Sequence, residues 1–332
     1  MSDTASNSPG RVVSNTASEG EIDVVVVGSV NTDYTISGPR LPTPGATIQG
    51  SEFRIEPGGK GANQAVAAIR LGARAALLAR VGKDDRGAFS IQQLQFAGVD
   101  TSAVLRDAQA MTGAALVMLA ESGEKQILTA PGANQELSAA DVSSASGLLA
   151  RAKVVLLQLE IPMAAVEAAA RIGRAAGARV VLDAGPAAPL TEELLRDVHV
   201  VRANSGEAEV LTGVRVHDAA SARRAAENLL RRGAGAACVG APGGNLLVTR
   251  ENELWLPHIA VRAIDATGAG DALSAGLAFA LAQGQPLDEA ARIGHAAAAL
   301  KTTKPGAQAG MPTRAEVLAL LQQVHRDGAR RN

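Results

Sequence analysis

Residues 22–28 read Ile-Asp-Val-Val-Val-Val-Gly, and this short run is the best guide to the fold. A β-branched run that ends in glycine is typical of a buried strand. Similar apolar runs recur at residues 75–81, 154–159, 179–182, 199–201 and 236–239, and alanine-rich helical segments lie between most of them, at 61–71, 86–97, 163–176 and 221–232. Apolar strands that alternate with helices predict an α/β fold, with a doubly wound, mostly parallel central sheet flanked by helices on both faces.

Two segments interrupt this alternation. Residues 32–57 contain several Pro and Gly residues and short alternating pieces, and residues 110–130 have the pattern of a β-hairpin. Neither contains a helical pattern, so we expect both to form one small antiparallel insertion beside the main sheet. Residues 1–20 offer little apolar surface to bury, which predicts a disordered tail, and residues 21–328 are expected to form the α/β domain.

The composition argues against several classes of partner. Lys and Arg number 32 against 33 for Asp and Glu, so the chain has no electrostatic footprint for nucleic acid or for an acidic membrane. No stretch approaches the ~18 consecutive apolar residues of a membrane span, and the N-terminus lacks the pattern of a secretory signal. The single cysteine, Cys238, cannot form an internal disulfide. We expect a cytoplasmic protein that binds neither nucleic acid nor membranes.

The strongest motif is Asp265-Ala-Thr-Gly-Ala-Gly-Asp271, which runs directly into an apolar helix. Glycines at 268 and 270 let backbone N–H groups turn toward one point, and a helix N-terminus adds partial positive charge there. Together they predict a phosphate-binding turn. Asp271 beside it is placed to accept a proton from an attacking hydroxyl. The alternative is a plain N-capping aspartate on a glycine-rich turn.

A second glycine-rich motif, Pro57-Gly-Gly-Lys-Gly-Ala-Asn-Gln-Ala65, also leads into a helix. It is not a P-loop, because no Ser or Thr follows its Gly-Lys pair. Its glycines allow the backbone to approach a ligand, and Lys60 and Asn63 are suited to hydrogen-bond a polyhydroxylated molecule. The alternative is a tight turn that carries a solvated lysine.

Further polar residues follow apolar strands, where a doubly wound sheet binds its ligands. Asn31 and Asp33 lie two residues apart in an extended segment and can point the same way toward adjacent hydroxyls. Glu160 ends an apolar run, where a buried carboxylate needs a partner. Asn204 and Glu207 could orient the waters of a magnesium ion, or could simply cap a helix.

These motifs, in this order, resemble the ribokinase family of sugar kinases, within the wider group of phosphofructokinase-B-type enzymes. The similarity runs from about residue 22 to residue 325, and residues 58–63 and 265–271 look like the two signatures of the family. The stretches 42–45, 295–299 and 304–308 are also very similar to it. The resemblance implies a kinase that transfers the γ-phosphate of ATP to the 5-hydroxyl of D-ribose, with Asp271 as general base.

The resemblance also implies roles for individual residues. It places the sugar against Asn31, Asp33, Gly59, Lys60, Asn63, Glu160 and Asp271, and the transferring phosphoryl group in an anion hole at Gly268, Ala269 and Gly270. It places the nucleotide against Asn204, Val239, Gly240, Ala241, Gly243, Gly244, Gly270 and His295. It implies Mg²⁺ governed indirectly by Glu207, and K⁺ held mostly by backbone carbonyls among Asp265, Thr267, Lys301, Lys304, Gly306 and Gly310. The β insertion would be a lid that closes over the sugar and pairs two subunits into a homodimer.

Two departures from the family pattern concern the nucleotide and the base. The family usually has a Thr-x-Gly-x-x-Gly turn over the phosphates, but the aligned run here has Val239 and Ala241 in place of Thr and Gly. Ala266 and Ala272 replace residues that are often Thr. Three alternatives therefore stay open: a kinase for another pentose, a hexose or a nucleoside, a non-catalytic sugar-binding regulator on the same fold, and a structural protein.

Overall fold

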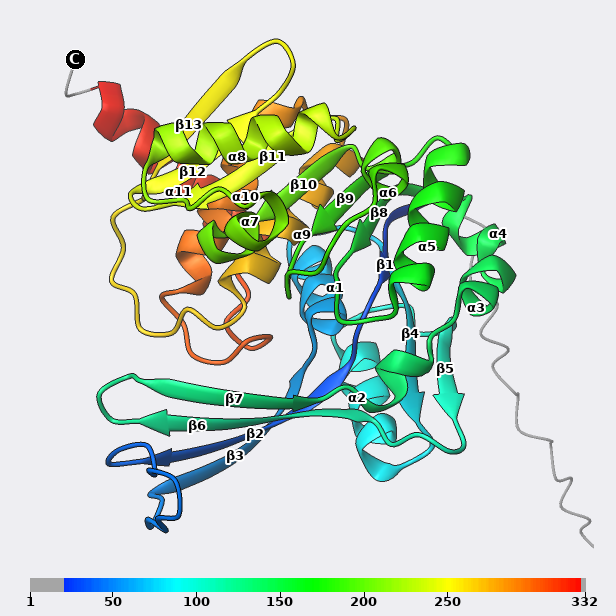
Figure 1. The fold of residues 1–332 in the computed structure, drawn as a ribbon, viewed down its shortest axis with the longest axis vertical. Coiled ribbons are helices and arrows are strands. Elements are labelled where there is room, and N and C mark those ends of the chain that lie inside the picture. Colours follow the sequence, from blue (N-terminus) through cyan, green and yellow to red (C-terminus); the bar gives the residue numbers. More distant parts are fainter. Residues whose placement is uncertain (1–20, 330–332) are drawn as a thin grey trace, which may run out of the picture.

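The computed structural model describes residues 21–329, so the predicted tail at 1–20 lies outside the described residues. A nine-stranded sheet forms the centre of the molecule (Figure 1). Its strands, in spatial order, are β13 (Glu253–Pro257), β12 (Gly244–Val248), β11 (Ala237–Ala241), β10 (Val200–Ala203), β9 (Arg179–Asp183), β8 (Ala152–Leu157), β1 (Ile22–Val27), β4 (Ala75–Gly82) and β5 (Val104–Asp107). The strands from β11 to β5 run parallel, and β12 and β13 are antiparallel.

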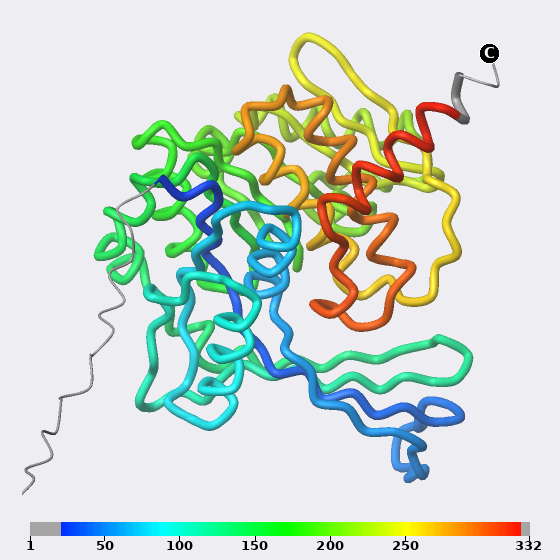
Figure 2. Tube along the Cα trace, turned by 180° about the vertical axis from the view of Figure 1, so that it is seen from behind, coloured from blue at the N-terminus to red at the C-terminus, as the bar shows by residue number. Residues whose placement is uncertain are grey.

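Helices cover both faces of this sheet, as Figures 1 and 2 show from opposite sides. One face carries α3 (Ala139–Ser144), α4 (Ser146–Leu149), α5 (Met163–Ala175), α6 (Glu192–Asp197), α7 (Ser205–Thr212) and α8 (Ala219–Arg231). The other carries α1 (Lys60–Arg70), α2 (Asp85–Phe96), α9 (Ala269–Ala282), α10 (Leu287–Lys301) and α11 (Arg314–Ala329). Val25 and Val27 of β1 pack into the first core, while Val24 and Val26 pack into the second. The unbroken valine run therefore reflects a strand that is buried on both sides, and the predicted fold class is confirmed.

The edge of the main sheet differs from the expectation. Residues 239–244 were expected to form a turn over phosphates, but Val239, Gly240 and Ala241 belong to β11, and Gly244 begins β12. Only Pro242 and Gly243 form the turn, with Gly243 at φ +90°. Sequence patterns missed β12 and β13, because a short hairpin of this kind lacks the helix that marks the other strands.

A second sheet of four strands, in the order β3-β2-β6-β7, projects from one end of the main body (Figure 1). It contains β2 (Asn31–Gly38) with β3 (Glu52–Gly58), and β6 (Gly113–Ala120) with β7 (Lys125–Ala130). Both hairpins are antiparallel, but β2 pairs with β6 in parallel, so the expectation of a purely antiparallel insertion is wrong. In the chain, β2 follows β1 and β6 follows β5, and both β1 and β5 run parallel to β4 in the main sheet. Within residues 21–329, no helix has both the length and the apolar character that a membrane span requires.

Close contact between α9 and α10 depends on glycine. A Cβ atom on Gly294 would lie 2.5 Å from the carbonyl oxygen of Leu273, and one on Gly276 would lie 2.8 Å from the Cα of Gly294. We predict that Gly294→Ala forces the two helices apart and lowers the free energy of unfolding by about 1–3 kcal/mol, the usual cost of overpacking. Urea denaturation followed by circular dichroism measures this change.

Gly147 provides the matched control, because a Cβ there meets no atom within 4 Å and the residue lies in the short helix α4. Gly147→Ala is expected to leave the stability unchanged or to raise it slightly, since alanine favours helix over glycine. Equal stabilities for the two variants would show that the α9–α10 contact does not need its glycines.

Candidate active site

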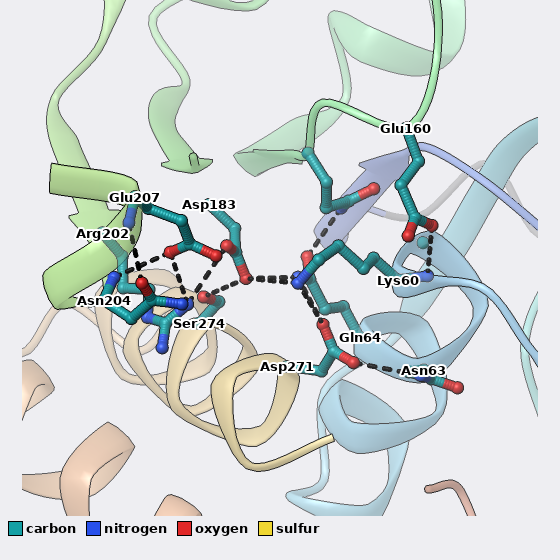
Figure 3. A network of polar contacts seen from close by, with 12 residues as sticks. Lys60, Asn63, Gln64, Glu160, Asp183, Arg202, Asn204, Glu207, Asp271 and Ser274 are labelled. Atoms are coloured by element: carbon teal, nitrogen blue, oxygen red, sulfur yellow. Dashed lines mark hydrogen bonds and ion pairs between the residues drawn. The ribbon is translucent and has the colours of Figure 1, made fainter. Parts of the chain in front are cut away.

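A buried carboxylate lies at the start of α9. Gly268 caps this helix with φ +79°, a conformation that favours glycine, and Asp271 follows in the first turn with only 4% of its surface exposed. Its Oδ2 accepts a hydrogen bond from Asn63 Nδ2 at 3.0 Å, and its Oδ1 accepts one from Gln64 Nε2 at 3.1 Å (Figure 3). The Lys60 ammonium lies 3.6 Å from the same Oδ1. The carboxylate thus faces the second glycine-rich motif, as the sequence predicted.

Glycine contacts bring α1 to this position. Gly59 has φ +88°, and a Cβ on it would lie 2.7 Å from the backbone nitrogen of Asn31. A Cβ on Gly61 would lie 2.6 Å from the backbone nitrogen of Ser29. Side chains at either position would therefore push α1 away from the loop after β1. These glycines let α1 pack closely against the loop after β1. This packing places the first turn of α1 opposite α9.

The charges around this carboxylate oppose one another. Burial raises the pKa of Asp271, while the Lys60 ammonium and the amides of Asn63 and Gln64 partly offset that rise. Burial also works against the charge of Lys60, but the carboxylates of Asp183 and Asp271 outweigh it and raise its pKa. A carboxylate with a raised pKa is a better proton acceptor than an ordinary aspartate, which suits a general base.

Asp33 and Glu160 lie nearby and differ in their partners. Glu160 accepts hydrogen bonds from the Lys60 backbone nitrogen at 3.0 Å and from the Ser29 hydroxyl. Asp33 Oδ1 is buried and has no hydrogen-bond partner within residues 21–329. Burial, with the charges of Glu160, Glu56 and Asp271, raises the pKa of Asp33 to about 7. An unsatisfied buried carboxylate costs free energy, and a hydroxyl donor from a ligand would remove this cost.

The Asn31 side chain lies at the base of the small sheet. Its Oδ1 accepts a hydrogen bond from Asn134 Nδ2 at 2.8 Å, and the Asn134 amide also holds the backbone of Val30 at 2.9 Å. This bond fixes which way the Asn31 amide faces. Asn134 itself carried no sequence signal, because it lies in a short 3₁₀ turn, Gly132–Glu136, between the two sheets.

A second group of charges adjoins the first and was not predicted as such. The fully buried Asp183 ends β9, and its Oδ2 accepts hydrogen bonds from Gln64 Nε2 at 2.9 Å and from Ser274 Oγ at 3.0 Å. Arg202 of β10 approaches Asp183 Oδ1 at 3.3 Å and Glu207 Oε2 at 3.4 Å. Asp183 could have been found by the reasoning applied to Glu160, because it also ends an apolar run. Arg202 and Ser274 could not, since each is one polar residue within an apolar element.

Arg202 also reaches the expected anion hole. A Cβ on Gly270 would lie 2.9 Å from its Nη1, so the guanidinium packs directly on this glycine. The N–H of Ala269 donates to the carbonyl of Ala266 at 3.1 Å. Gly270 and the neighbouring Asp271 lie in the first turn of α9, whose N–H groups have no intrahelical acceptor. The Arg202 charge therefore lies where phosphate oxygens are expected.

Asn204 and Glu207 form the capping box of α7. Asn204 Oδ1 accepts from the Glu207 backbone nitrogen at 2.8 Å, and Glu207 Oε2 accepts from the Asn204 backbone nitrogen at 2.7 Å. The capped-helix interpretation thus describes their contacts. A Cβ on Gly240 would lie 3.4 Å from the Cα of Asn204, so the start of α7 lies next to the β11 residues that were also expected at the nucleotide.

His295 lies in α10 beside the β12–β13 hairpin. Its Nε2 donates to the Pro257 carbonyl at 2.9 Å, so Nδ1 accepts from Asn245 Nδ2, also at 2.9 Å. Burial lowers the pKa of His295, which agrees with this neutral form. These two hydrogen bonds therefore fix the neutral ring near Gly244, on the side where the nucleotide was expected.

The residues expected to hold K⁺ converge, but not around an open space. Lys301 Nζ donates to the carbonyl oxygens of Asp265 at 3.1 Å and of Lys304 at 3.0 Å. Gly306 donates its N–H to Asp265 Oδ2 at 2.9 Å, and Thr267 donates its N–H to Asp265 Oδ1 at 2.9 Å. Carbonyls expected to bind the ion thus accept hydrogen bonds from an ammonium group of the chain. The ammonium thus occupies the place expected for the ion, and the residues as they lie do not fit a potassium ion.

The fold and this site define a phosphotransferase that acts on an alcohol group. The family model for "pfkB family carbohydrate kinase" matches residues 21–314, and the chain belongs to this family. It is 40% identical over 302 residues to a ribokinase of Haemophilus influenzae, covering 91% of this chain and 99% of the relative. It is 37% identical to a ribokinase of Mus musculus, covering 87% of this chain and 91% of the relative.

Solved structures agree with this assignment. The structure of Arabidopsis thaliana ribokinase complexed with ribose and ATP superposes with a TM-score of 0.83 at 32% identity, covering 91% of this chain and 99% of that one. A ribokinase of Giardia lamblia superposes with a TM-score of 0.84 at 26% identity, covering 92% of this chain and 100% of that one.

The unusual pKa of Asp33 generates a prediction about stability. Its pKa is about 7 in the folded protein, against about 4 in an unfolded chain. The folded state therefore holds an extra proton between these values, and stability falls as the pH rises through this window. We predict that Asp33→Asn melts at a higher temperature than the parent at pH 8, and that the difference vanishes near pH 4. Calorimetry across this pH range, without sugar, measures it.

Asp107 provides a control of opposite sign. Backbone N–H groups of Ala110 and Gln109, with Arg80, lower its pKa to about 2, so its charge stabilises the fold at neutral pH. Asp107→Asn should melt below the parent at pH 8. If Asp33→Asn behaves like Asp107→Asn, the Asp33 carboxylate is a structural group rather than one reserved for a ligand.

Proposed function

We propose that this protein is an ATP-dependent kinase that phosphorylates the 5-hydroxyl of D-ribose. The observation that carries the proposal is the Asp271 carboxylate, buried at the N-terminus of α9 and directed at Lys60 and Asn63. The relatives named ribokinase, and the Arabidopsis thaliana structure with ribose and ATP, support the substrate. The intact set of expected sugar residues, Asn31, Asp33, Gly59, Lys60, Asn63 and Glu160, supports it as well.

Phosphoryl transfer requires the protein mainly to position the reactants and to stabilise the charge on the transferring phosphoryl group. In the proposed reaction the sugar lies between the base of the small sheet and α1, with its primary hydroxyl against Asp271. Asp271 takes the proton as the hydroxyl oxygen attacks the γ-phosphate. The N–H groups of Gly270 and Asp271, at the positive end of α9, hold the charge on the transferring group. Arg202, packed on Gly270, adds a permanent positive charge beside it.

Magnesium is proposed to arrive with the nucleotide. Within residues 21–329, no three His, Cys, Asp or Glu side chains converge as a metal cage. This fits Mg²⁺, which is usually held by substrate phosphates, waters and few carboxylates. Glu207 would be the carboxylate that accepts a hydrogen bond from a magnesium-bound water. The ion would neutralise charge on the phosphates.

The decisive experiment is a coupled assay of ADP release with a panel of sugars. We predict the highest kcat/KM for D-ribose, above 2-deoxyribose, hexoses and nucleosides. Asp271→Asn keeps the size of the side chain but removes the proton acceptor, so its turnover should fall at least ~100-fold while ribose binding persists.

Each alternative has its own outcome in this assay. A higher kcat/KM for another sugar or a nucleoside would indicate that this compound, rather than D-ribose, is the substrate. Ribose binding by calorimetry without ADP release in the parent would indicate a non-catalytic sugar-binding protein. Near-parental turnover of Asp271→Asn would remove Asp271 as the base.

We also propose that the small sheet closes over the sugar and pairs two copies of the chain. Strand register places Tyr34, Ile55, Leu116 and Leu128 in one row across the four strands, with Ile36 and Phe53 in the next row of the same face. Phe53 and Leu128 are 58% and 71% exposed. An apolar sheet face of this kind is typical of a protein interface.

The interface proposal predicts a change of mass. Leu128→Glu places a charge on this apolar face, at its most exposed large side chain, so the protein should shift from dimer to monomer in sedimentation equilibrium. Lys125→Glu changes a residue of the same strand on the opposite face, because its register differs by an odd number, and should remain dimeric. A monomeric parent protein would contradict the proposal.

A further inference from the structure

The ammonium group of Lys301 is buried and has several oxygen partners. It is the last residue of α10, and its side chain is 0% exposed. Its Nζ donates to the carbonyl oxygens of Asp265 and Lys304, and lies 3.9 Å from Asp265 Oδ2. These three oxygens come from two segments that are separated by more than thirty residues in the sequence. The ammonium therefore links the segment before α9 to the loop after α10.

The loop around the ammonium is tightly closed. A Cβ on Gly310 would lie 2.7 Å from the carbonyl oxygen of Gly306, 2.9 Å from the Cε of Lys301 and 3.0 Å from the carbonyl oxygen of Lys304. Gly310 must be glycine because the lysine side chain and these carbonyls occupy the space beside it. Three of the residues that were expected around a potassium ion, Asp265, Lys304 and Gly310, thus lie against the Lys301 side chain.

The chemistry of these contacts suits a charged ammonium. The carbonyl oxygens of Asp265 and Lys304 and the carboxylate of Asp265 are all hydrogen-bond acceptors, and an ammonium has three donors and no acceptor. Burial lowers the pKa of Lys301, but the carboxylates of Asp265 and Glu56 act in the opposite direction. The C-terminal end of α10 adds partial negative charge at the same place.

This cation is connected to the catalytic turn. Asp265, whose carbonyl binds the ammonium, accepts the backbone N–H of Thr267 and so shapes the turn before Gly268. On the other side, the loop after Lys301 contains Gln308, whose Nε2 donates to Asn63 Oδ1 at 3.1 Å. Asn63 in turn donates to Asp271. Lys301 is therefore linked to the turn before Gly268 through Asp265, and to Asp271 through the loop that contains Gln308.

We propose that the Lys301 ammonium is a tethered monovalent cation that takes the place of a potassium ion, positions the 265–268 turn, and makes the enzyme independent of added K⁺. Lys301 is a positioning residue, because it touches neither substrate nor the reacting atoms. The activity readout of this proposal rests on the proposed kinase function, whereas its ion-binding readout does not.

The test compares the parent with two variants that both remove the charge. Lys301→Ala opens a space among the carbonyls, while Lys301→Met fills it with an uncharged chain of similar length. Each protein is assayed and melted in K⁺, and in tetramethylammonium at the same ionic strength. Lys83→Ala, which removes an exposed lysine, controls for the loss of one positive charge.

The parent should show equal turnover and equal melting temperature in the two salts. Lys301→Ala should lose roughly 10- to 100-fold in kcat in tetramethylammonium, the cost of a misplaced catalytic group, with little change in the Kd for ribose. Potassium should restore most of its kcat and raise its melting temperature, since an ion that binds only the folded state stabilises it. Lys301→Met should show the loss without the rescue, and Lys83→Ala should match the parent.

Specific stimulation or stabilisation of the parent by K⁺ would overturn the proposal, even if neither variant folds. So would a folded Lys301→Ala whose melting temperature is the same in both salts. If the parent phosphorylates none of the sugars, the proposed function fails, and the melting temperatures of the parent and Lys301→Ala still decide whether Lys301 replaces an ion.

Discussion

The structure depends on the meeting of two helix N-termini, those of α1 and α9, through the Asp271 carboxylate. Two amides of α1 donate to this one carboxylate, and the ammonium of Lys60 lies beside them. A carboxylate removed from water would be costly without such partners. Because the partners come from residues about two hundred positions away in the chain, this contact fixes α1 and α9 against each other. The same interaction therefore sets the geometry of the site and the position of α1 relative to α9.

The buried charges form a balanced set rather than a single pair. Asp183 and Asp271 share Gln64 and Lys60 as partners, and Arg202 adds a second cation on the far side of Asp183 (Figure 3). Such a network is worth little as a source of stability, since desolvation offsets most of the attraction. Its value lies in fixing charge in place before a substrate binds, which is the main requirement for phosphoryl transfer.

Asp33 and Lys301 are both buried charged groups, but they differ in their hydrogen-bond partners. Asp33 carries a raised pKa and an unpartnered oxygen at the place where the small sheet meets the main body. A fold selected only for stability would not keep such a group, whereas a ligand with hydroxyl donors would satisfy it. By contrast, the buried ammonium of Lys301 donates hydrogen bonds to two carbonyl oxygens, which indicates a structural role.

Local patterns of the sequence determined much of this protein. The alternation of apolar strands and alanine-rich helices predicted the parallel sheet, because a strand buried on both faces must be apolar throughout. The glycine motifs predicted both helix N-termini, and Asp271, Lys60 and Asn63 were expected to meet. The predicted end of β8 was two residues too late, because the apolar pattern continues past the last hydrogen-bonded pair, at Leu157.

Only the tertiary structure decided the features that depend on contacts between distant segments. The parallel pairing of β2 with β6 joins two segments that are far apart in the sequence, and the network of Asp183 with Arg202 joins two adjacent strands of the main sheet. The place of the Lys301 side chain could not be read from its neighbours in the sequence. Whether a lysine at a helix end points to water or into a ring of carbonyls depends on which loop packs beside it, and that is a property of the folded chain.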